Sequence, residues 1–354
     1  MIETRLRVGL IGFGYAGKTF HAPLIRTTPG LELAAVASSD AGKVRAALGL
    51  DAAVFSRADE LIAQADIDLV VIASPNATHA GLATRALQAG RHVVVDKPFT
   101  ANAAEALQLG ALASERGLLL SVFHNRRWDS TTRTAKKLLA SGMLGEIRYA
   151  AMHYDRFRPQ PVERWKEDAA AGGGLWMDLA PHLLDEALGY FGRPLAIQAD
   201  IAAVRPGAGA DDSFHARLRY AGGLRVDLQA SMLGAMPRPR LVLQGMRGTY
   251  VKQGLDPQEA ALKAGLLPAP ADDGAWGIDE DAGVAMLGQD GEARRIAVPT
   301  ENGAYPAYYR QVAEAIRGRA ANPVPLDEAI AVMRLLDAGR ESSLGRCEVA
   351  LAWE

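Results

Sequence analysis

The run VGLIGFGYAGKTFHAPLI, residues 8–25, decides the fold, because it passes from an apolar strand to a helix across three glycines. Gly12, Gly14 and Gly17 have the spacing G-x-G-x-x-G. At a strand-to-helix junction, the first glycine permits a tight turn, the second lets the backbone approach a pyrophosphate, and the third allows close helix–strand packing. The stretch therefore predicts a dinucleotide-binding turn rather than one that only packs. Its residues are Gly12, Phe13, Gly14, Tyr15, Ala16 and Gly17.

The first third of the chain alternates short apolar runs with segments of helical periodicity. Its candidate strands are rich in Val, Ile, Leu and Ala without polar alternation, as expected where helices cover both faces of a sheet. This rhythm predicts a doubly wound parallel sheet of the Rossmann type over residues 1–124. The candidate strands are residues 7–11, 31–37, 52–55, 68–73, 92–96 and 118–123.

After about residue 124 the pattern changes to longer, alternating strands. Tight turns such as YAGGLR (220–225) favour an open, mainly antiparallel sheet. We therefore expect a second, α+β domain over residues 125–354, within which residues 255–300 form a loose excursion. Its expected helices are residues 129–141, 176–191, 306–318 and 326–344.

The bulk composition excludes several classes of protein. The chain has 354 residues, 49% of them hydrophobic, and a formal net charge of −2. Lys and Arg never run beyond two in a row, so a nucleic acid is not an expected partner. A single cysteine, Cys347, rules out a disulfide within the chain and a cysteine-based zinc site. With no apolar run long enough for a membrane span and no room for a leader before the first strand, we expect a cytoplasmic protein. A metal is not expected: Asp178 and His182 could form a two-ligand site, but no third ligand is evident nearby.

The end of the second expected strand bears on the choice of dinucleotide. Enzymes that use NAD place an acid there for the ribose 2′-hydroxyl. This chain has Ser38 and Ser39, with Lys43 on the following turn, which better suits a 2′-phosphate. We expect NADP, with NAD as the alternative, because a shift of one or two residues would make Asp40 the ribose acid.

Two further stretches carry groups suited to catalysis. VVVDKPFT, residues 93–100, places Asp96 and Lys97 at the carboxyl end of a strand, where open α/β sheets bind ligands. Asp178 and His182 are four residues apart and thus share one helix face. Because Pro181 is not expected deep inside a helix, that helix should begin near residue 177 or 178. Taken alone, such an Asp/His pair could also be an ordinary surface hydrogen bond.

These pieces, together with SPNATH at residues 74–79, resemble the Gfo/Idh/MocA oxidoreductases over the whole chain and in the expected order. Four more stretches are similar to the subgroup that contains NADP-dependent scyllo-inositol dehydrogenases: FHAPLI (20–25), SVFHNRRWDS (121–130), DRFRPQ (155–160) and GAYPAYY (303–309). The family usually has Glu-Lys-Pro where this chain has Asp96-Lys97-Pro98, so the lysine is kept. The resemblance implies dimers or tetramers formed through the open sheet of the second domain.

Oxidation of a secondary alcohol by a nicotinamide requires a base and a group that stabilises alkoxide charge. His182 suits the base, Lys97 the charge stabilisation, and Asp178 the orientation of the substrate; the resemblance assigns the same three positions. The cofactor is further expected to contact Ser38, Ser39, Lys43, Ser74, Pro75, Asn76, His79, Asp96 and Lys97. The substrate is expected to contact Lys97, Asn125, Arg127, His153, Asp178 and His182.

The resulting prediction is an NADP-dependent dehydrogenase of a cyclic polyol or sugar, an inositol first. The alternatives are a dehydrogenase of another sugar or aldose, and a non-catalytic regulator that senses NAD(P). Tyr305, Tyr308 and Tyr309 could either cover the pocket or pack in a core.

Overall fold

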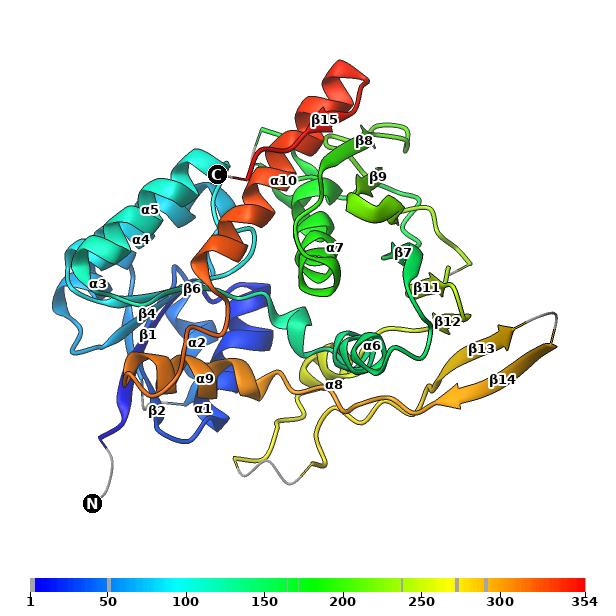
Figure 1. Ribbon diagram of the computed structural model, residues 1–354. Helices are drawn as coiled ribbons and strands as arrows, with labels where there is room; N and C mark the ends of the chain where they lie inside the picture. Colours follow the sequence, from blue (N-terminus) through cyan, green and yellow to red (C-terminus); the bar gives the residue numbers. More distant parts are fainter. Residues whose placement is uncertain are drawn as a thin grey trace. The chain divides into compact units, whose positions relative to one another are not determined.

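The computed structural model forms two compact units, each built around one sheet (Figure 1). It describes residues 4–49, 52–163, 165–170, 172–236, 238–270, 274–289 and 292–353. The first unit contains residues up to Asn125 together with Pro257–Trp276 and Ala304–Ile330. The second contains Arg126–Asp256, Gly277–Gly303 and Ala331–Glu354.

The first unit confirms the predicted doubly wound fold. Its six strands are parallel and follow the order β3-β2-β1-β4-β5-β6, so the order reverses between β1 and β4. Side chains of β4 and β5 are almost entirely buried, as expected when both faces of the sheet are covered. The strands are β1 (Leu6–Ile11), β2 (Leu31–Ala37), β3 (Ala53–Phe55), β4 (Leu69–Ile72), β5 (His92–Val95) and β6 (Leu120–Val122).

The helices of this unit come from three parts of the chain. Residues 257–276 and 304–330 join it although they follow the second unit's strands, so the units do not separate at one cut after residue 124. Tyr308 contacts Ser121 (3.0 Å) and Asn322 donates to the Leu120 carbonyl (2.8 Å), and these bonds fix the late segments against β6. The helices are η1 (Gly17–His21), α1 (Ala22–Thr27), α2 (Ala41–Leu48), α3 (Ala58–Gln64), η2 (Asn76–Thr78), α4 (His79–Gln88), α5 (Ala103–Arg116), α8 (Gln258–Lys263), α9 (Pro306–Ile316) and the start of α10 (Leu326–Gly345).

The second unit has the predicted open, mostly antiparallel sheet. Among the residues that the structure describes, it holds nine strands in the order β14-β13-β12-β11-β7-β10-β9-β8-β15, and of these only β7 and β10 pair in parallel. The strands are β7 (Ile147–His153), β8 (Ala196–Ala202), β9 (Ser213–Arg219), β10 (Arg225–Ser231), β11 (Leu241–Gly245), β12 (Gly248–Lys252), β13 (Gly283–Gln289), β14 (Glu292–Val298) and β15 (Val349–Ala350). The helical segments are η3 (Asn125–Trp128, whose first residue belongs to the first unit), α6 (Ser130–Ser141), η4 (Trp165–Glu167), α7 (Leu175–Phe191), η5 (Ala221–Gly223) and most of α10.

The described residues between 255 and 300 are more ordered than the loose excursion that the sequence suggested. They contain α8 and the hairpin of β13 and β14. The ammonium of Lys252 is fully buried and lies 3.2 Å from Asp281 and 3.4 Å from Asp279, and Ser130 donates to Asp279 (2.7 Å). These contacts fix the position of the segment that leads into the hairpin. The local sequence did not indicate them.

Helix α7 begins at Leu175, two to three residues earlier than Pro181 suggested. Gly174, with φ +114, turns the chain into the helix, and the carboxylate of Asp211 accepts the Trp176 amide (2.6 Å). This remote carboxylate satisfies an amide that a helix start leaves unpaired, so the helix extends beyond the prediction. Figure 1 shows α7 in green, and the helix packs against β9 and β10. Within the described part of the chain, no helix combines the length and apolar character needed to cross a membrane.

Candidate active site

The three glycines of the first turn each occupy a different environment. Gly12 has φ +96, and a Cβ there would lie 2.5 Å from the Ala73 carbonyl oxygen. At Gly17 a Cβ would lie 2.0 Å from the Gly12 carbonyl oxygen. At Gly14 a Cβ would meet nothing within 4 Å, so this residue borders open space. Gly12 thus makes the tight turn, Gly17 allows the close packing, and Gly14 leaves space for the backbone to approach a pyrophosphate. The glycine-rich stretch therefore fits a dinucleotide.

The difference between Gly14 and Gly17 gives a prediction. Gly14→Ala should leave the thermal unfolding midpoint nearly unchanged but weaken dinucleotide binding, because the methyl group occupies space that the pyrophosphate would use. Gly17→Ala should lower the midpoint by several degrees, since a contact of 2.0 Å with backbone cannot be relieved by a side-chain movement. Differential scanning calorimetry and dinucleotide titration of both variants measure this. Equal unfolding midpoints would contradict the assignment of the third glycine to packing.

The other predicted residues of the turn line its flanks. Phe13 is buried, whereas Tyr15 is 51% exposed and donates its hydroxyl to Glu259 on α8 (2.9 Å). Burial, opposed by Lys263 and assisted by Glu259, raises the pKa of Tyr15. The phenol therefore remains a donor throughout the neutral pH range.

At the end of β2, Asp40 caps the helix that follows. Asp40 precedes α2 and accepts the Lys43 amide at its Oδ1 (2.8 Å), so its carboxylate acts as the N-cap of that helix. Ser38 Oγ in turn accepts the Asp40 amide (3.2 Å). Ser39 and the Lys43 side chain are exposed. Asp40, the acid that would have indicated NAD, thus uses one of its carboxylate oxygens to cap α2.

Loops after two neighbouring strands, β4 and β5, are joined by one histidine. His79 is buried, with Nε2 2.9 Å from the Ser74 carbonyl and Nδ1 2.8 Å from the Pro98 carbonyl. It was expected to line the cofactor, and its ring connects the two loops that follow these strands. Ser74 contacts Thr78 (2.6 Å), while Pro75 is exposed and Asn76 half-buried at the start of η2.

Lys97 is the second residue after β5, and the carboxylate of the preceding Asp96 fixes its backbone. Oδ1 of Asp96 accepts the Lys97 amide (2.9 Å), and the Lys97–Pro98 peptide is cis. Because β5 is separated from β1 only by β4, Lys97 lies at the same sheet edge as the glycine turn. Ligands bind at this edge in open α/β sheets, next to the reversal in strand order.

In the second unit, Asp178 lies in the first turn of α7 between two cations. Its Oδ1 is 2.8 Å from Lys166 Nζ and its Oδ2 is 3.3 Å from Arg156 Nη1. The Asp178 side chain is 14% exposed, and His182, one turn further along the helix, is buried. Both cations come from the segment between β7 and α7, which thereby carries part of the site.

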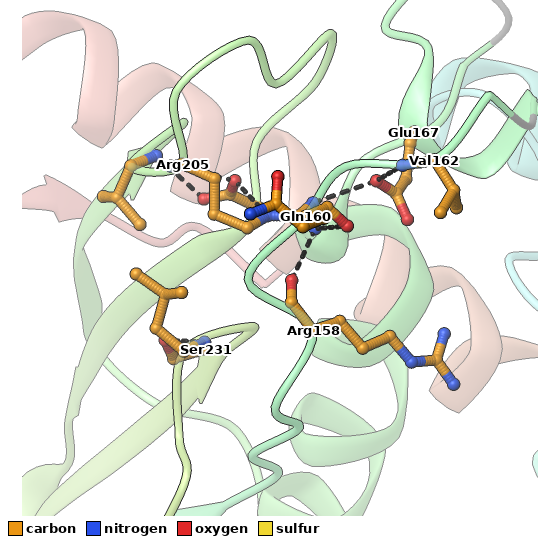
Figure 2. A network of polar contacts seen from close by, with 9 residues as sticks. Arg158, Gln160, Val162, Glu167, Arg205 and Ser231 are labelled. Carbon is orange, nitrogen blue, oxygen red and sulfur yellow. Dashed lines mark hydrogen bonds and ion pairs between the residues drawn. The ribbon is translucent and has the colours of Figure 1, made fainter.

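A buried arginine anchors that segment, as Figure 2 shows. Arg205 donates to the carbonyl of Arg158 (2.8 Å) and to the carboxylates of Glu167 (3.0 Å) and Asp212 (2.8 Å). Glu167 also accepts the Val162 amide (3.1 Å). These bonds hold both ends of the segment that brings Arg156 and Lys166 to Asp178.

The inner side of α7 carries a second charged cluster. Glu186 pairs with Arg240, and both side chains are almost fully buried. Burial raises the pKa of Glu186 to about 7, although Arg240 opposes the shift. The guanidinium groups of Arg240 and Arg156 lie over the Tyr154 ring, 5.8 Å and 5.4 Å from its centre. This ring therefore links the buried pair to a cation that holds Asp178.

The remaining predicted substrate residues have structural contacts of their own. Arg127 forms a bidentate ion pair with Asp185 of α7, with hydrogen bonds of 2.6 to 3.1 Å. Nδ1 of His153 is 2.6 Å from the Pro239 carbonyl, and burial lowers its pKa. Asn125 is buried at the first residue of η3. Across the residues that the structure describes, no three His, Cys, Asp or Glu side chains gather in a way that could hold a metal ion.

Comparison with known proteins agrees with this geometry. Residues 6–124 match the family model described as "Oxidoreductase family, NAD-binding Rossmann fold", and residues 136–351 match its C-terminal alpha/beta domain. The oxidoreductase YdgJ of Escherichia coli is 50% identical over 99% of this chain and all of its own length. IolW of Bacillus subtilis, named scyllo-inositol 2-dehydrogenase (NADP(+)), is 36% identical over 96% of this chain and 94% of its own.

A solved structure is also similar over nearly the full length. The putative oxidoreductase YPO2259 from Yersinia pestis superposes with a TM-score of 0.91 and 48% identity, covering 99% of this chain and 98% of that one. Both family models match in the order and positions of the two sheets described above. The chain therefore belongs to the Gfo/Idh/MocA family of NAD-binding oxidoreductases.

Proposed function

We propose that this oxidoreductase is an NADP-dependent dehydrogenase of a cyclic polyol or sugar, with scyllo-inositol as the leading candidate substrate. The observation that carries the proposal is the position of Lys97, an ammonium at the sheet edge that also carries the dinucleotide turn. Such a group can stabilise negative charge on a substrate oxygen next to the nicotinamide. The similarity to IolW supports the polyol and the choice of NADP.

Each residue has a defined role in the proposed oxidation. The bound nicotinamide supplies the hydride acceptor. We assign His182 to accept the hydroxyl proton, since an imidazole ordinarily titrates near neutral pH. Lys97 donates a hydrogen bond to the same oxygen as the carbonyl forms. Asp178, fixed by Arg156 and Lys166, orients the neighbouring hydroxyl groups.

Polyol recognition requires several polar contacts, because each buried hydroxyl left unpaired weakens binding. Asn125, Arg127 and His153 are proposed for this role. The ion pair of Arg127 with Asp185 and the bond of His153 to Pro239 would hold these side chains in position before the substrate arrives. Prepositioned groups lose less conformational entropy on binding.

The choice of NADP gives a prediction at Lys43. Lys43→Ala should weaken NADP by about tenfold to a hundredfold, the range for a charge-assisted hydrogen bond to phosphate, and change NAD affinity little. Isothermal titration with both dinucleotides measures the difference. Glu60→Ala, a charge removal on the neighbouring α3, serves as a control. Equal losses for NADP and NAD at Lys43 would overturn the cofactor assignment.

The proposed substrate class is tested by a panel of scyllo-inositol, myo-inositol and common aldoses with each dinucleotide. Formation of reduced nicotinamide is followed by absorbance. Fastest turnover with an inositol and NADP supports the proposal, and preference for an aldose would move the assignment to another sugar. Tight NADP binding with no turnover on the whole panel would favour a sensing regulator.

We further propose assembly into homodimers or homotetramers through the open sheet of the second unit. Near one end of this sheet Phe157 pairs with Leu233, and the exposed Leu233 and Met236 line a cavity of about 410 Å³. Exposed apolar groups around a hollow are typical of surfaces that bind another protein. Light scattering of the purified chain distinguishes a monomer from either assembly.

A further inference from the structure

Two motifs that the proposed chemistry does not use meet inside the first unit. His21, from FHAPLI, and Tyr309, from GAYPAYY, are 288 residues apart in sequence, yet the Tyr309 hydroxyl lies 2.6 Å from His21 Nδ1. Both side chains are fully buried. On its other side, His21 Nε2 lies 3.7 Å from Oδ1 of Asp96, which is longer than a hydrogen bond but within ion-pair range when the imidazole is charged. A line of polar groups thus runs from Tyr309 through His21 to the residue that precedes Lys97.

Aromatic rings isolate His21 and Tyr309 from water. The Phe123 ring lies 4.4 Å from the His21 ring and 5.9 Å from the Tyr309 ring, centre to centre. Phe123 is itself buried, and Tyr308 packs edge-on against both Phe123 and Tyr309. In so apolar an environment, electrostatic interactions between polar groups are stronger than in water. A polar side chain kept here must therefore have compensating partners.

The neighbouring groups determine which atom donates in the hydrogen bond between Tyr309 and His21. Burial, and then the nearby Tyr308 and Asp96, raise the pKa of Tyr309, so its phenol keeps its proton. When Tyr309 donates to Nδ1, a neutral imidazole carries its proton on Nε2, facing Asp96. A charged imidazole also carries a proton there. The remaining tautomer would turn a lone pair toward the carboxylate, which electrostatics disfavours.

Asp96 connects this arrangement to the catalytic machinery. Partial burial alone would raise the pKa of Asp96, but His21, Lys97 and His79 together lower it below its ordinary value. His21 belongs to η1 and His79 to α4, and Lys97 follows β5, so the three groups that lower this pKa come from different elements. The carboxylate in turn accepts the Lys97 amide at 2.9 Å. An ionised Asp96 thus fixes the peptide on which Lys97 is carried.

We infer that His21 and Tyr309 are positioning residues for Lys97, acting through Asp96. Tyr309 sets the orientation and tautomer of the imidazole, and the imidazole holds Asp96 ionised and in place. Asp96 then fixes the backbone from which the Lys97 ammonium reaches the substrate oxygen. The functional part of this inference rests on the proposed role of Lys97 in hydride transfer.

The test is the titration of the Lys97 amide in the full-length protein without cofactor. Selective ¹⁵N-lysine labelling resolves this amide, and Lys97→Arg assigns it. Because the amide donates to Asp96, its chemical shift follows ionisation of the carboxylate. We expect the parent to titrate below the ordinary aspartate value of about 4. In His21→Gln the midpoint should rise by about one pH unit or more. Burial raises the pKa of Asp96, and without the imidazole only Lys97 and His79 oppose this effect.

Activity provides the second readout. Protonated Asp96 no longer holds Lys97, so kcat/KM should show a second acid limb at lower pH than the one set by His182, and this second limb should shift to higher pH in His21→Gln, in the same direction as the amide titration. Tyr309→Phe removes only a hydroxyl group and should lower kcat about fivefold, as expected for one neutral hydrogen bond. Tyr308→Phe is the matched control: a neighbouring buried tyrosine, whose hydroxyl bonds Ser121, should leave both the limb and the amide unchanged.

The outcomes separate the two proposals. An unchanged Lys97 amide titration in His21→Gln would overturn the inference, whatever the activity. If His21→Gln does not fold, Tyr309→Phe decides: equal effects of Tyr309→Phe and Tyr308→Phe on kcat and the pH profile would also overturn it. Full activity of a variant without the Lys97 ammonium would remove the proposed function, while the amide titration still reports on the link from His21 to Asp96.

Discussion

Lys97→Met is expected to lower kcat by about 10²–10³-fold, the usual cost of removing one preorganised donor from a developing oxyanion. Methionine keeps much of the side-chain length but offers neither charge nor a hydrogen bond. Dinucleotide affinity should stay close to that of the parent, because the glycine turn that holds the pyrophosphate is separate in sequence and unaltered. Steady-state kinetics and dinucleotide titration measure the two effects.

Lys137→Met is the matched control for this variant. Lys137 is 73% exposed and pairs with Glu301 on the surface of the second unit, so its loss should change kcat little. A Lys97→Met protein that retains its kcat would show that the ammonium takes no part in catalysis. A loss of dinucleotide binding in parallel with kcat would instead make Lys97 a cofactor contact alone.

The second large effect is expected at His182. His182→Asn should lower the rate of alcohol oxidation by about 10²–10⁴-fold, the contribution of a positioned general base. The base must be deprotonated to act, so the parent loses activity as the pH falls. In the variant the plateau that the deprotonated base provides should disappear, and the residual rate should instead rise in proportion to hydroxide concentration. The pH profiles of kcat/KM in the oxidation direction measure both changes.

His215→Asn is the control for this histidine. His215 lies on β9 with its side chain 47% exposed and 3.6 Å from Asp227, on a part of the second unit to which no catalytic role is assigned. Its substitution should leave the pH profile unchanged. An unaltered profile in His182→Asn would contradict the assignment of the base.

Local patterns predicted the first unit well. The run at residues 8–25 shows both the strand and the turn because glycine spacing, strand composition and helix onset all depend on residues close together in sequence. The apolar β4 and β5 were evident for the same reason. The late segments that complete this unit were not evident. The hydrogen bond between Tyr309 and His21 joins residues 288 positions apart, and the periodicity of nearby residues cannot predict so distant a contact.

Long-range polar contacts also explain what the sequence did not predict in the second unit. The remote carboxylate of Asp211 caps α7, which overrides the start suggested by Pro181. Arg205 is indistinguishable in sequence from any surface arginine, yet it is buried and holds the segment that carries Lys166. Asp178 was evident from its spacing to His182, whereas its ion pairs with Arg156 and Lys166 depend on how that segment folds back.

The most direct measurement of the central claim is a single-turnover reaction of the protein with NADP⁺ and scyllo-inositol deuterated on carbon. We expect reduced nicotinamide to appear, deuterium to be found on it, and Lys97→Met to slow its appearance by about 10²–10³-fold. Oxidation of the inositol at equal rates in the parent and in Lys97→Met would contradict the account. So would the absence of deuterium transfer from the inositol to NADP⁺ bound at the glycine turn.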